Sequence, residues 1–267
     1  MKTRILVVAV LSLVAGSIAQ AQEPQLQGWV DLTYSSKYVW RGFDIFADKS
    51  ATHLGVDLNY DGFGIDIMGH RANAGGFENA ERWDFNPFYA GGLFMDQPCA
   101  VQYRLGWVYY NYPDNKATDF DIQEAHAIVA MPKLLPQGIV PSYALVKLWP
   151  SSSGSLVGAR SPFGGTASGW AHIFMLDYAL SVNGILPETP EQVFNFHAEA
   201  VYNDGVGPGG QSVDHDWSNA VFGVSTDVDL GENLAFTPGV YHQVTMDTSV
   251  NDDKDETWVS LGLRYSF

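Results

Sequence analysis

The feature that most constrains this sequence is a strict alternation of apolar and polar side chains that continues to its last residue. Every second side chain of the final segment is apolar: Val259, Leu261, Leu263, Tyr265 and Phe267. The residues between them are small, polar or basic. Successive side chains of a β-strand point to opposite faces, so this period of two predicts a strand with one apolar and one polar face.

The same alternation recurs along most of the chain. Leu54, Val56 and Leu58, for example, alternate with His53 and Asp57. Counting such segments predicts twelve strands, near residues 28–42, 51–60, 63–71, 82–94, 100–111, 119–131, 138–149, 169–181, 193–203, 217–228, 234–246 and 257–267.

The connections between these predicted strands alternate in length. Long polar connections fall at residues 72–81, 112–118, 150–168, 204–216 and 247–256, and short turns at 61–62, 96–99, 132–137 and 229–233. Residues 182–192 form a longer turn where a short one is expected. An even strand number with this sorting of loops is typical of outer-membrane barrels. We therefore predict an all-β fold, a transmembrane antiparallel up-and-down β-barrel of about twelve strands.

The first 21 residues have the pattern of a secretory signal peptide. Lys2 and Arg4 precede an apolar run, and residues 19–21 read Ala-Gln-Ala, a small-x-small cleavage site. Cleavage there leaves residues 22–267 as a single barrel domain in a bacterial outer membrane. Cys99 is the only cysteine, so no intrachain disulfide can form. The formal net charge of −16 excludes a nucleic-acid binder, which needs the opposite sign.

A membrane environment accounts for the aromatic content and for the last residue. A sheet in hydrocarbon must close on itself, because every backbone donor and acceptor needs a partner within the protein. Aromatic residues make up 13% of the chain and cluster near predicted strand ends, where amphipathic rings meet the lipid headgroups. The terminal Phe267, with Tyr265, resembles the insertion signal of outer-membrane proteins. We therefore expect outer-membrane lipid and the barrel-assembly machinery as partners.

The polar face of each predicted strand would line the barrel interior. An Arg or Lys facing lipid near the bilayer midplane costs roughly 2 to 4 kcal/mol, so charged residues are placed inside. The predicted pore-lining residues are Asp31, Lys37, Arg41, Asp57, Asp66, His70, Asp84, Arg104, Glu124, Asp177, Glu199, Asp227 and Arg264. The alternation is ambiguous in the strands that carry Glu124, His126 and Lys147, so their inward direction is less strongly indicated. Two interpretations stay open: these charges brace a narrow interior in pairs, or their acidic surplus makes the pore favour cations. Loop 150–168 either folds inward as a constriction or remains outside.

Several short motifs resemble a known family. Residues 38–42 read Tyr-Val-Trp-Arg-Gly, and residues 107–113 read Trp-Val-Tyr-Tyr-Asn-Tyr-Pro before a loop. An acidic strand resumes at 119–124, and residues 84–91 contain an Asp followed by Tyr-Ala-Gly. These segments resemble the TorF-family porins, also described as the Gcw_chp domain. The resemblance implies a bacterial outer-membrane barrel that acts as a porin.

Enzyme and metal chemistry are weakly indicated. A lipid hydrolase on the barrel wall needs a Ser or His nucleophile system, but His172, His242, Ser168 and Ser225 match no catalytic spacing. The acidic residues at 252–256 offer oxygen ligands for calcium, although a solvated acidic loop is the expected interpretation. We therefore predict no enzyme, no cofactor and no metal site.

The predicted function is passive diffusion of ions or small hydrophilic solutes with a weak cation preference. Twelve strands enclose a lumen between that of the small, side-chain-filled barrels and that of the wide porins, which favours a narrow channel. The alternatives are a non-conducting barrel that binds or adheres through its long loops and, with less support, a barrel-wall lipid hydrolase.

Overall fold

The computed structural model describes residues 25–136, 138–151, 168–184, 191–204 and 215–267, so the predicted signal peptide and most of loop 150–168 lie outside the described residues. Twelve strands form one closed antiparallel barrel, as predicted. They are β1 (Gln27–Ser35), β4 (Ala51–Tyr60), β5 (Phe63–Ala72), β6 (Arg82–Leu93), β7 (Val101–Asn111), β8 (Ile122–Ala130), β9 (Ile139–Pro150), β10 (Gly169–Asn183), β11 (Glu191–Asp204), β12 (Asp216–Thr226), β14 (Leu234–Thr245) and β15 (Glu256–Ser266).

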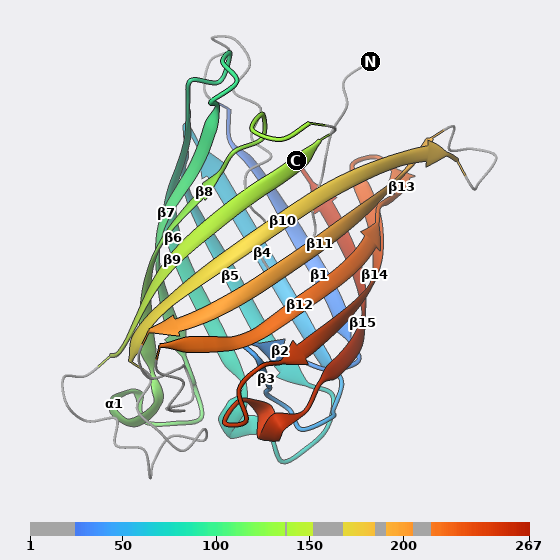
Figure 1. The fold of residues 1–267 in the computed structure, drawn as a ribbon. Coiled ribbons are helices and arrows are strands. Elements are labelled where there is room, and N and C mark those ends of the chain that lie inside the picture. Colours follow the sequence, from blue (N-terminus) through green and yellow to red (C-terminus); the bar gives the residue numbers. More distant parts are fainter. Residues whose placement is uncertain (1–24, 137, 152–167, 185–190, 205–214) are drawn as a thin grey trace.

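The barrel closes where the first and last strands meet. Each spanning strand pairs with its neighbours in the chain, and β1 pairs with both β4 and β15. Gly28 and Phe267 exchange two backbone hydrogen bonds of 3.0 Å, which extends the pairing to the last residue. Figure 1 shows the resulting closed wall of tilted strands. Among the described residues the twelve spanning strands are therefore paired on both sides, as a membrane-spanning sheet requires.

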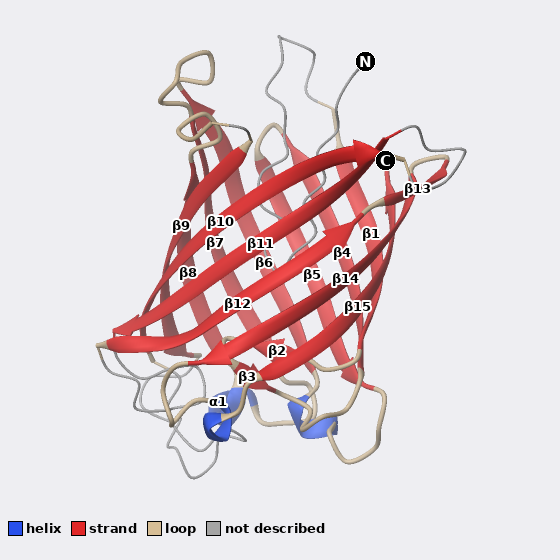
Figure 2. Ribbon diagram, turned by 45° about the vertical axis from the view of Figure 1, so that its right-hand side comes forward, coloured by secondary structure: helices blue, strands red, loops and turns tan. Residues whose placement is uncertain are grey.

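The two ends of the barrel differ, and we call them the turn end and the loop end. The turn end carries the C-terminus and short connections such as Asp61-Gly62, whose φ angles of 51° and 83° suit a tight hairpin. A short strand, β13 (Val228–Gly231), extends one of these hairpins. The loop end carries the short helices α1 (Ala117–Phe120), η1 (Glu78–Ala80) and η2 (Asn251–Asp253) (Figure 2). No helix among the described residues is long and apolar enough to cross a membrane.

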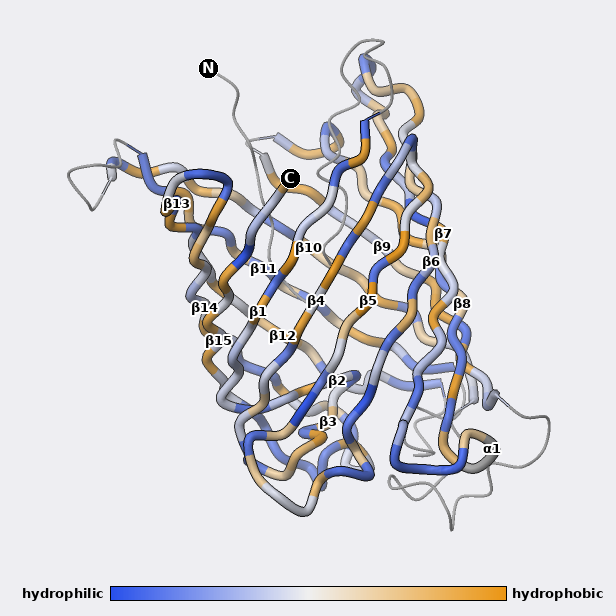
Figure 3. The backbone as a smooth tube through the Cα atoms, turned by 180° about the vertical axis from the view of Figure 1, so that it is seen from behind, coloured by the Kyte–Doolittle hydropathy of each residue, from blue (hydrophilic) through white to orange (hydrophobic). Residues whose placement is uncertain are grey.

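The outward face of the barrel is apolar. Leu32, Leu54, Phe174, Phe222 and Leu263 each leave more than a third of their surface exposed there. Figure 3 shows hydrophobic and hydrophilic positions alternating along β1, β4 and β5. An exposed apolar belt on a closed sheet suits contact with the hydrocarbon of a bilayer.

One predicted strand is wrong at its end. The alternation predicts a strand over 28–42, but β1 stops at Ser35 and residues 36–50 leave the barrel wall. Within them β2 (Val39–Trp40) and β3 (Phe43–Asp44) form a small hairpin. Arg41 and Gly42 are its two turn residues, with φ angles of 52° and 95°. The apolar period continues past Ser35 because Tyr38 and Trp40 are also apolar at every second position. Both side chains are buried, but they pack against other parts of the barrel and do not belong to its wall.

Candidate functional site

Residues 36–50, which we call the mouth loop, cross the lumen at the loop end. The Arg41 guanidinium donates a hydrogen bond of 2.8 Å from Nη2 to Oε2 of Glu124 on β8. The adjacent Gly42 carbonyl accepts one of 2.7 Å from Nε2 of Gln243 on β14. Four strands separate β8 from β14 in one direction around the barrel and six in the other. Two neighbouring residues are thus anchored to nearly opposite walls, and Figure 2 shows their hairpin, β2–β3, at this end of the barrel.

The Glu124 carboxylate is held by three donors. Besides Arg41, the Tyr110 hydroxyl donates to Oε2 over 2.7 Å, and Nδ1 of His126 lies 3.2 Å from Oε1. Only 3% of Glu124 is exposed. A buried charge is tolerated when it is paired and hydrogen-bonded, so the fixed position of Arg41 compensates the burial of this carboxylate.

A second anchor holds the aromatic residues of the mouth loop. Arg82 at the start of β6 is 2% exposed and forms a two-bond contact with Asp84, of 2.6 and 2.9 Å. Its Nη2 also donates to the Tyr38 hydroxyl over 2.7 Å. The guanidinium carbon lies 4.1 Å from the centre of the Trp40 ring and 4.6 Å from that of Tyr110. This stacking and the hydrogen bond fix two mouth-loop rings against the barrel wall.

Two histidines lie under Tyr38. The Tyr38 ring stacks on His70, with centroids 4.7 Å apart and planes at 10°. Nδ1 of His53 lies 2.8 Å from Nδ1 of His70, and Nε2 of His70 lies 3.1 Å from Oδ2 of Asp84. Because the carboxylate needs a donor, His70 carries its hydrogen on Nε2 and accepts at Nδ1 from His53. The chain of bonds from His53 to Asp84 thereby orients the surface on which Tyr38 lies.

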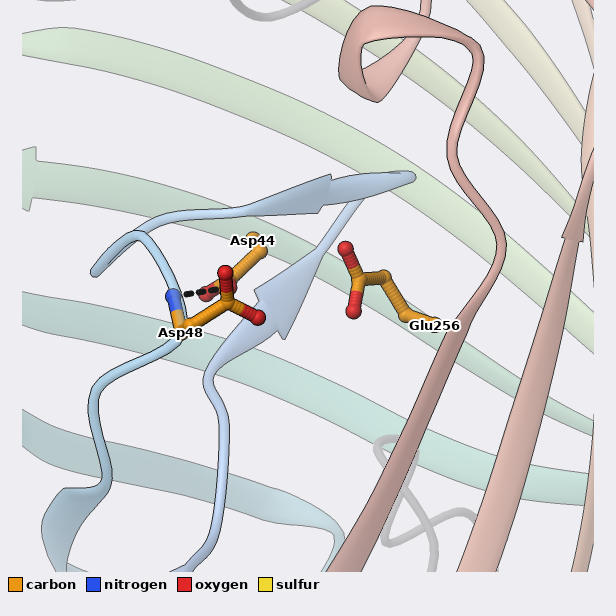
Figure 4. Close-up of side chains that lie close together, drawn as sticks. All are labelled: Asp44, Asp48 and Glu256. Carbon is orange, nitrogen blue, oxygen red and sulfur yellow. Dashed lines mark hydrogen bonds between the residues drawn. The ribbon is translucent and has the colours of Figure 1, made fainter.

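The outer side of the mouth loop carries a cluster of three carboxylates. Asp44, Asp48 and Glu256 place one ligand oxygen each within 4.8 Å of one another (Figure 4). Lys37 binds both Asp48 and Glu256 and supplies the positive charge that a cation would otherwise bring. Its hydrogen bond to Asp48 raises the pKa of Lys37 and lowers the pKa of Asp48. Burial raises the pKa of Asp44. The cluster ties the mouth loop to the start of β15.

The mouth loop also contacts the connection 246–255. The backbone N–H of Asp44 donates to Oδ1 of Asn251 over 3.0 Å, and Nδ2 of Asn251 donates to Glu256 over 2.8 Å. A Cβ atom added at Gly42 would lie 2.9 Å from the Val250 side chain and 3.0 Å from the Asn219 side chain. The two loops therefore form one layer over the lumen.

Nearer the turn end, two arginines stack on rings of the inner wall. Arg264 of β15 lies 4.2 Å over Trp29 and donates to Asp31 over 3.3 Å, and both charged residues are buried. Arg104 of β7 lies 3.6 Å over Phe88. These contacts hold the two bases against the wall rather than extended across the lumen.

Acidic residues lie between these two arginines. Asp57 and Asp66 face each other in register on β4 and β5, and Oδ2 of Asp66 is 3.9 Å from the Arg104 guanidinium. Like charges directly opposite each other on a sheet repel, and the positive charge of Arg104 partly offsets the repulsion between these two carboxylates.

On the other side of the barrel, β10 and β11 carry a separate polar group. His197 contacts Asp177 at 2.7 Å through Nδ1, and its Nε2 lies 3.9 Å from Glu199. Near the turn end Asp227 accepts a hydrogen bond of 2.5 Å from Thr237. These acids point inward, and the charge of Glu199 also acts on Arg41 of the mouth loop.

The structure places the predicted pore-lining residues in three settings. The inward face of the strands carries Asp31, Asp57, Asp66, His70, Asp84, Arg104, Glu124, Asp177, Glu199 and Arg264, with His126. Asp227 lies between β12 and β13, and Lys37 and Arg41 lie on the mouth loop rather than on the barrel wall. Lys147 faces outward, contrary to the prediction, with its Nζ 5.2 Å from the outward Trp170 ring.

Sequence reasoning missed five residues that hold the mouth loop: Tyr38, Trp40, His53, Arg82 and Gln243. The pattern did contain a signal for one of them, because Arg82 is two positions before Asp84 and so shares its face of the strand. The rings at 38 and 40 were assigned to the barrel wall by the same period of two.

The two candidate hydrolase histidines have hydrogen-bond partners other than the candidate serines. Nδ1 of His172 lies 2.7 Å from the Tyr143 hydroxyl, and Nδ1 of His242 lies 2.8 Å from the Thr257 hydroxyl. Ser225 is buried on the inner side of β12, away from both. The geometry assembles no Ser–His pair from these residues.

Solved structures share this fold. A structure of the NanC porin matches with a TM-score of 0.56 and 8% identity over 89% of this chain and all of that chain. A KdgM porin in complex with disordered oligogalacturonate matches with a TM-score of 0.51 and 11% identity over 90% of this chain and 99% of that chain. No protein-family model and no curated protein sequence matches the chain. The chain thus shares with these porins the fold of a closed antiparallel β-barrel.

Proposed function

We propose that this protein is an outer-membrane channel for passive diffusion of ions and small hydrophilic solutes. The observation that carries the proposal is the division of the closed barrel into an apolar outer face and a charged inner face. Soluble proteins rarely expose a large continuous apolar surface, so an apolar belt around the whole barrel favours contact with lipid. Likeness in fold to two porins supports the same reading.

The inner charges favour cations. Among the described residues, the inward acids include Asp31, Asp57, Asp66, Asp84, Glu124, Asp177, Glu199 and Asp227, and the inward bases include Arg41, Arg82, Arg104 and Arg264. Each base is held by an acid or a ring, so the surplus that a diffusing ion meets is negative. We therefore propose a weak cation preference and expect a polyanion such as oligogalacturonate to be disfavoured.

Planar-bilayer recording of the refolded protein tests the function. We expect discrete conductance steps and, in a tenfold KCl gradient, a reversal potential of the sign that indicates K⁺ over Cl⁻. Added oligogalacturonate should leave the current unchanged. Anion selectivity, or block by oligogalacturonate, would contradict the acidic-lumen argument, and a folded barrel without any steps would contradict the channel itself.

The packing of the mouth loop across the lumen favours a second candidate, a non-conducting barrel that acts through its loops. It predicts a stable barrel without conductance even when the mouth loop is removed. Deletion of the loop, described below, separates the two candidates.

Membership in the TorF family also stays a prediction. The motif at residues 38–42 that resembles the family contains the turn that crosses the lumen, Arg41-Gly42. If the resemblance is real, the equivalent segment of another TorF-family protein should leave the barrel wall and cross its lumen. A solved structure of such a protein with this segment in a wall strand would count against the assignment.

A further inference from the structure

We propose that the mouth loop, residues 36–50, is a plug that shuts the channel, and that the buried Arg41–Glu124 pair is its latch. The inference rests on the proposed channel function and concerns the regulation of that channel. In the structure described above the pore is closed, and solutes pass only when the tip of the loop leaves its two anchors.

The first argument is the path of the loop. Arg41 is bound to β8 and Gly42 to β14, so the backbone at this turn spans the lumen instead of following one wall. A loop that lies along one wall narrows a pore, whereas one fixed on opposite walls divides it. Tyr38 and Trp40 occupy the side toward β6 and β7 through Arg82 and Tyr110.

The second argument is the packing at the same level of the barrel. Phe46, Gln243 and Val250 have no exposed surface, and Asn219 beside Gly42 is almost fully buried. The Phe46 ring packs on Tyr38 and on Phe77 of the next loop. At this level of the barrel, side chains of the mouth loop therefore pack directly against side chains of the wall and of the neighbouring loops.

The third argument is that the loop can leave without damage to the barrel. The hairpin at its tip is not part of the ladder that closes the wall, because β2 pairs only with β3. The backbone bonds between the loop and the wall strands are at its two ends, where the Ser36 N–H donates to Val259 and the Ser50 carbonyl accepts from Asn73. Its fixation depends on side-chain contacts, and the ion pair Arg41–Glu124 is the buried charged contact at the tip. Neutralising one member removes the ion-pair partner of the other, whose charge then stays buried without its main compensation until the tip withdraws into water.

The test compares single-channel recordings of four variants with the unmodified protein. Glu124→Gln and Arg41→Gln each remove one side of the latch, and the double variant removes both. Lys254→Gln is the matched control, since it breaks the exposed Lys254–Asp252 pair in the adjoining loop. Heat-modifiable migration on a gel shows that each variant is a folded barrel.

We expect the unmodified protein and Lys254→Gln to open rarely, and each latch variant to raise the open probability at least tenfold. The double variant should open no more than the single variants, because all three lose the same contact. Latch variants that fold and open as rarely as the unmodified protein would overturn the latch.

A fifth variant, with residues 38–47 replaced by two glycines, separates failure of the plug from failure of the channel. We expect it to conduct continuously. If the unmodified protein already conducts as this deletion does, the plug is refuted and the channel stands. If the folded deletion variant conducts nothing, the proposed channel function fails. Should the deletion variant not fold, the two latch variants still decide the inference.

Discussion

Replacement of Glu124 by Gln should destabilise the folded barrel by an amount that measures how tightly the mouth loop is held. Removing one member of a buried ion pair costs about 3 to 5 kcal/mol, because the remaining charge is left uncompensated. Here Glu124 and Arg41 are both largely buried and separated by 2.8 Å. The amide oxygen of Gln can still accept from Tyr110, so the loss comes from the stranded Arg41 guanidinium.

The loop sets an upper limit to this loss. Arg41 can escape burial by withdrawing with the tip of the mouth loop, so the measured cost cannot exceed the free energy of withdrawal. We expect a loss of about 3 kcal/mol for Glu124→Gln and a smaller loss for Arg41→Gln/Glu124→Gln, in which no charge is stranded. The exposed Lys254–Asp252 pair should contribute less than about 1 kcal/mol.

Urea unfolding of the protein folded into lipid vesicles, followed by tryptophan fluorescence, measures these free energies. Linear extrapolation requires the same slope for every variant. A loss below about 1 kcal/mol for Glu124→Gln would refute the reasoning, since it would show that the pair is solvated. So would a double variant that is less stable than Glu124→Gln, because two neutral amides leave no buried charge to compensate.

Two further predictions concern the cap of the mouth loop and the C-terminus. The bond to Lys37 lowers the pKa of Asp48 in the folded protein, so this ion pair stabilises the fold above pH 3.8, the usual Asp value, and the stabilisation is lost as pH falls through the lowered pKa. The same bond raises the pKa of Lys37, so the stabilisation is fully present up to pH 10.5, the usual Lys value, and is lost only at higher pH. Hydrogen exchange of residues 36–50, corrected for intrinsic rates, should stay slow between about pH 5 and 10 and rise below about pH 4, and Lys37→Met should remove that rise. Phe267→Ser should lower the amount of folded barrel in cells several-fold if Phe267 is part of an insertion signal. It should leave refolding in vesicles nearly unchanged, because half of the side chain is exposed and the backbone bonds to Gly28 remain. Equal amounts of folded barrel in cells, measured by heat-modifiable migration on gels, would count against an insertion signal.

Comparison with the two porins of similar fold concerns architecture alone. The KdgM porin was solved with an acidic oligosaccharide, but this chain shares 11% identity with it. The inner wall described here has more acids than bases, and its bases are stacked or paired. Two barrels of similar fold can therefore attract solutes of different charge, because the charges on the inner wall and not the fold decide this attraction.

The sequence by itself determined the barrel. Alternation is a local property: each strand residue points to the opposite side from its neighbour, whatever it later contacts. The twelve strands, their antiparallel order and the inward direction of residues such as Asp31 and Arg264 follow from that period and from the need of a membrane sheet to close. Where both faces of a strand are apolar, as around Lys147 on β9, the period carries no information and the prediction was wrong.

Only the tertiary structure decided where residues 36–50 go. Tyr38 and Trp40 continue the alternation of β1, so sequence placed them in the wall, and the structure instead packs them inside the barrel against Arg82. Arg41 meets Glu124 across 83 positions of sequence, and Gly42 meets Gln243 across 201. Such contacts exist only after closure has brought β8 and β14 to opposite sides of one lumen, and no local pattern records which residues will then face each other.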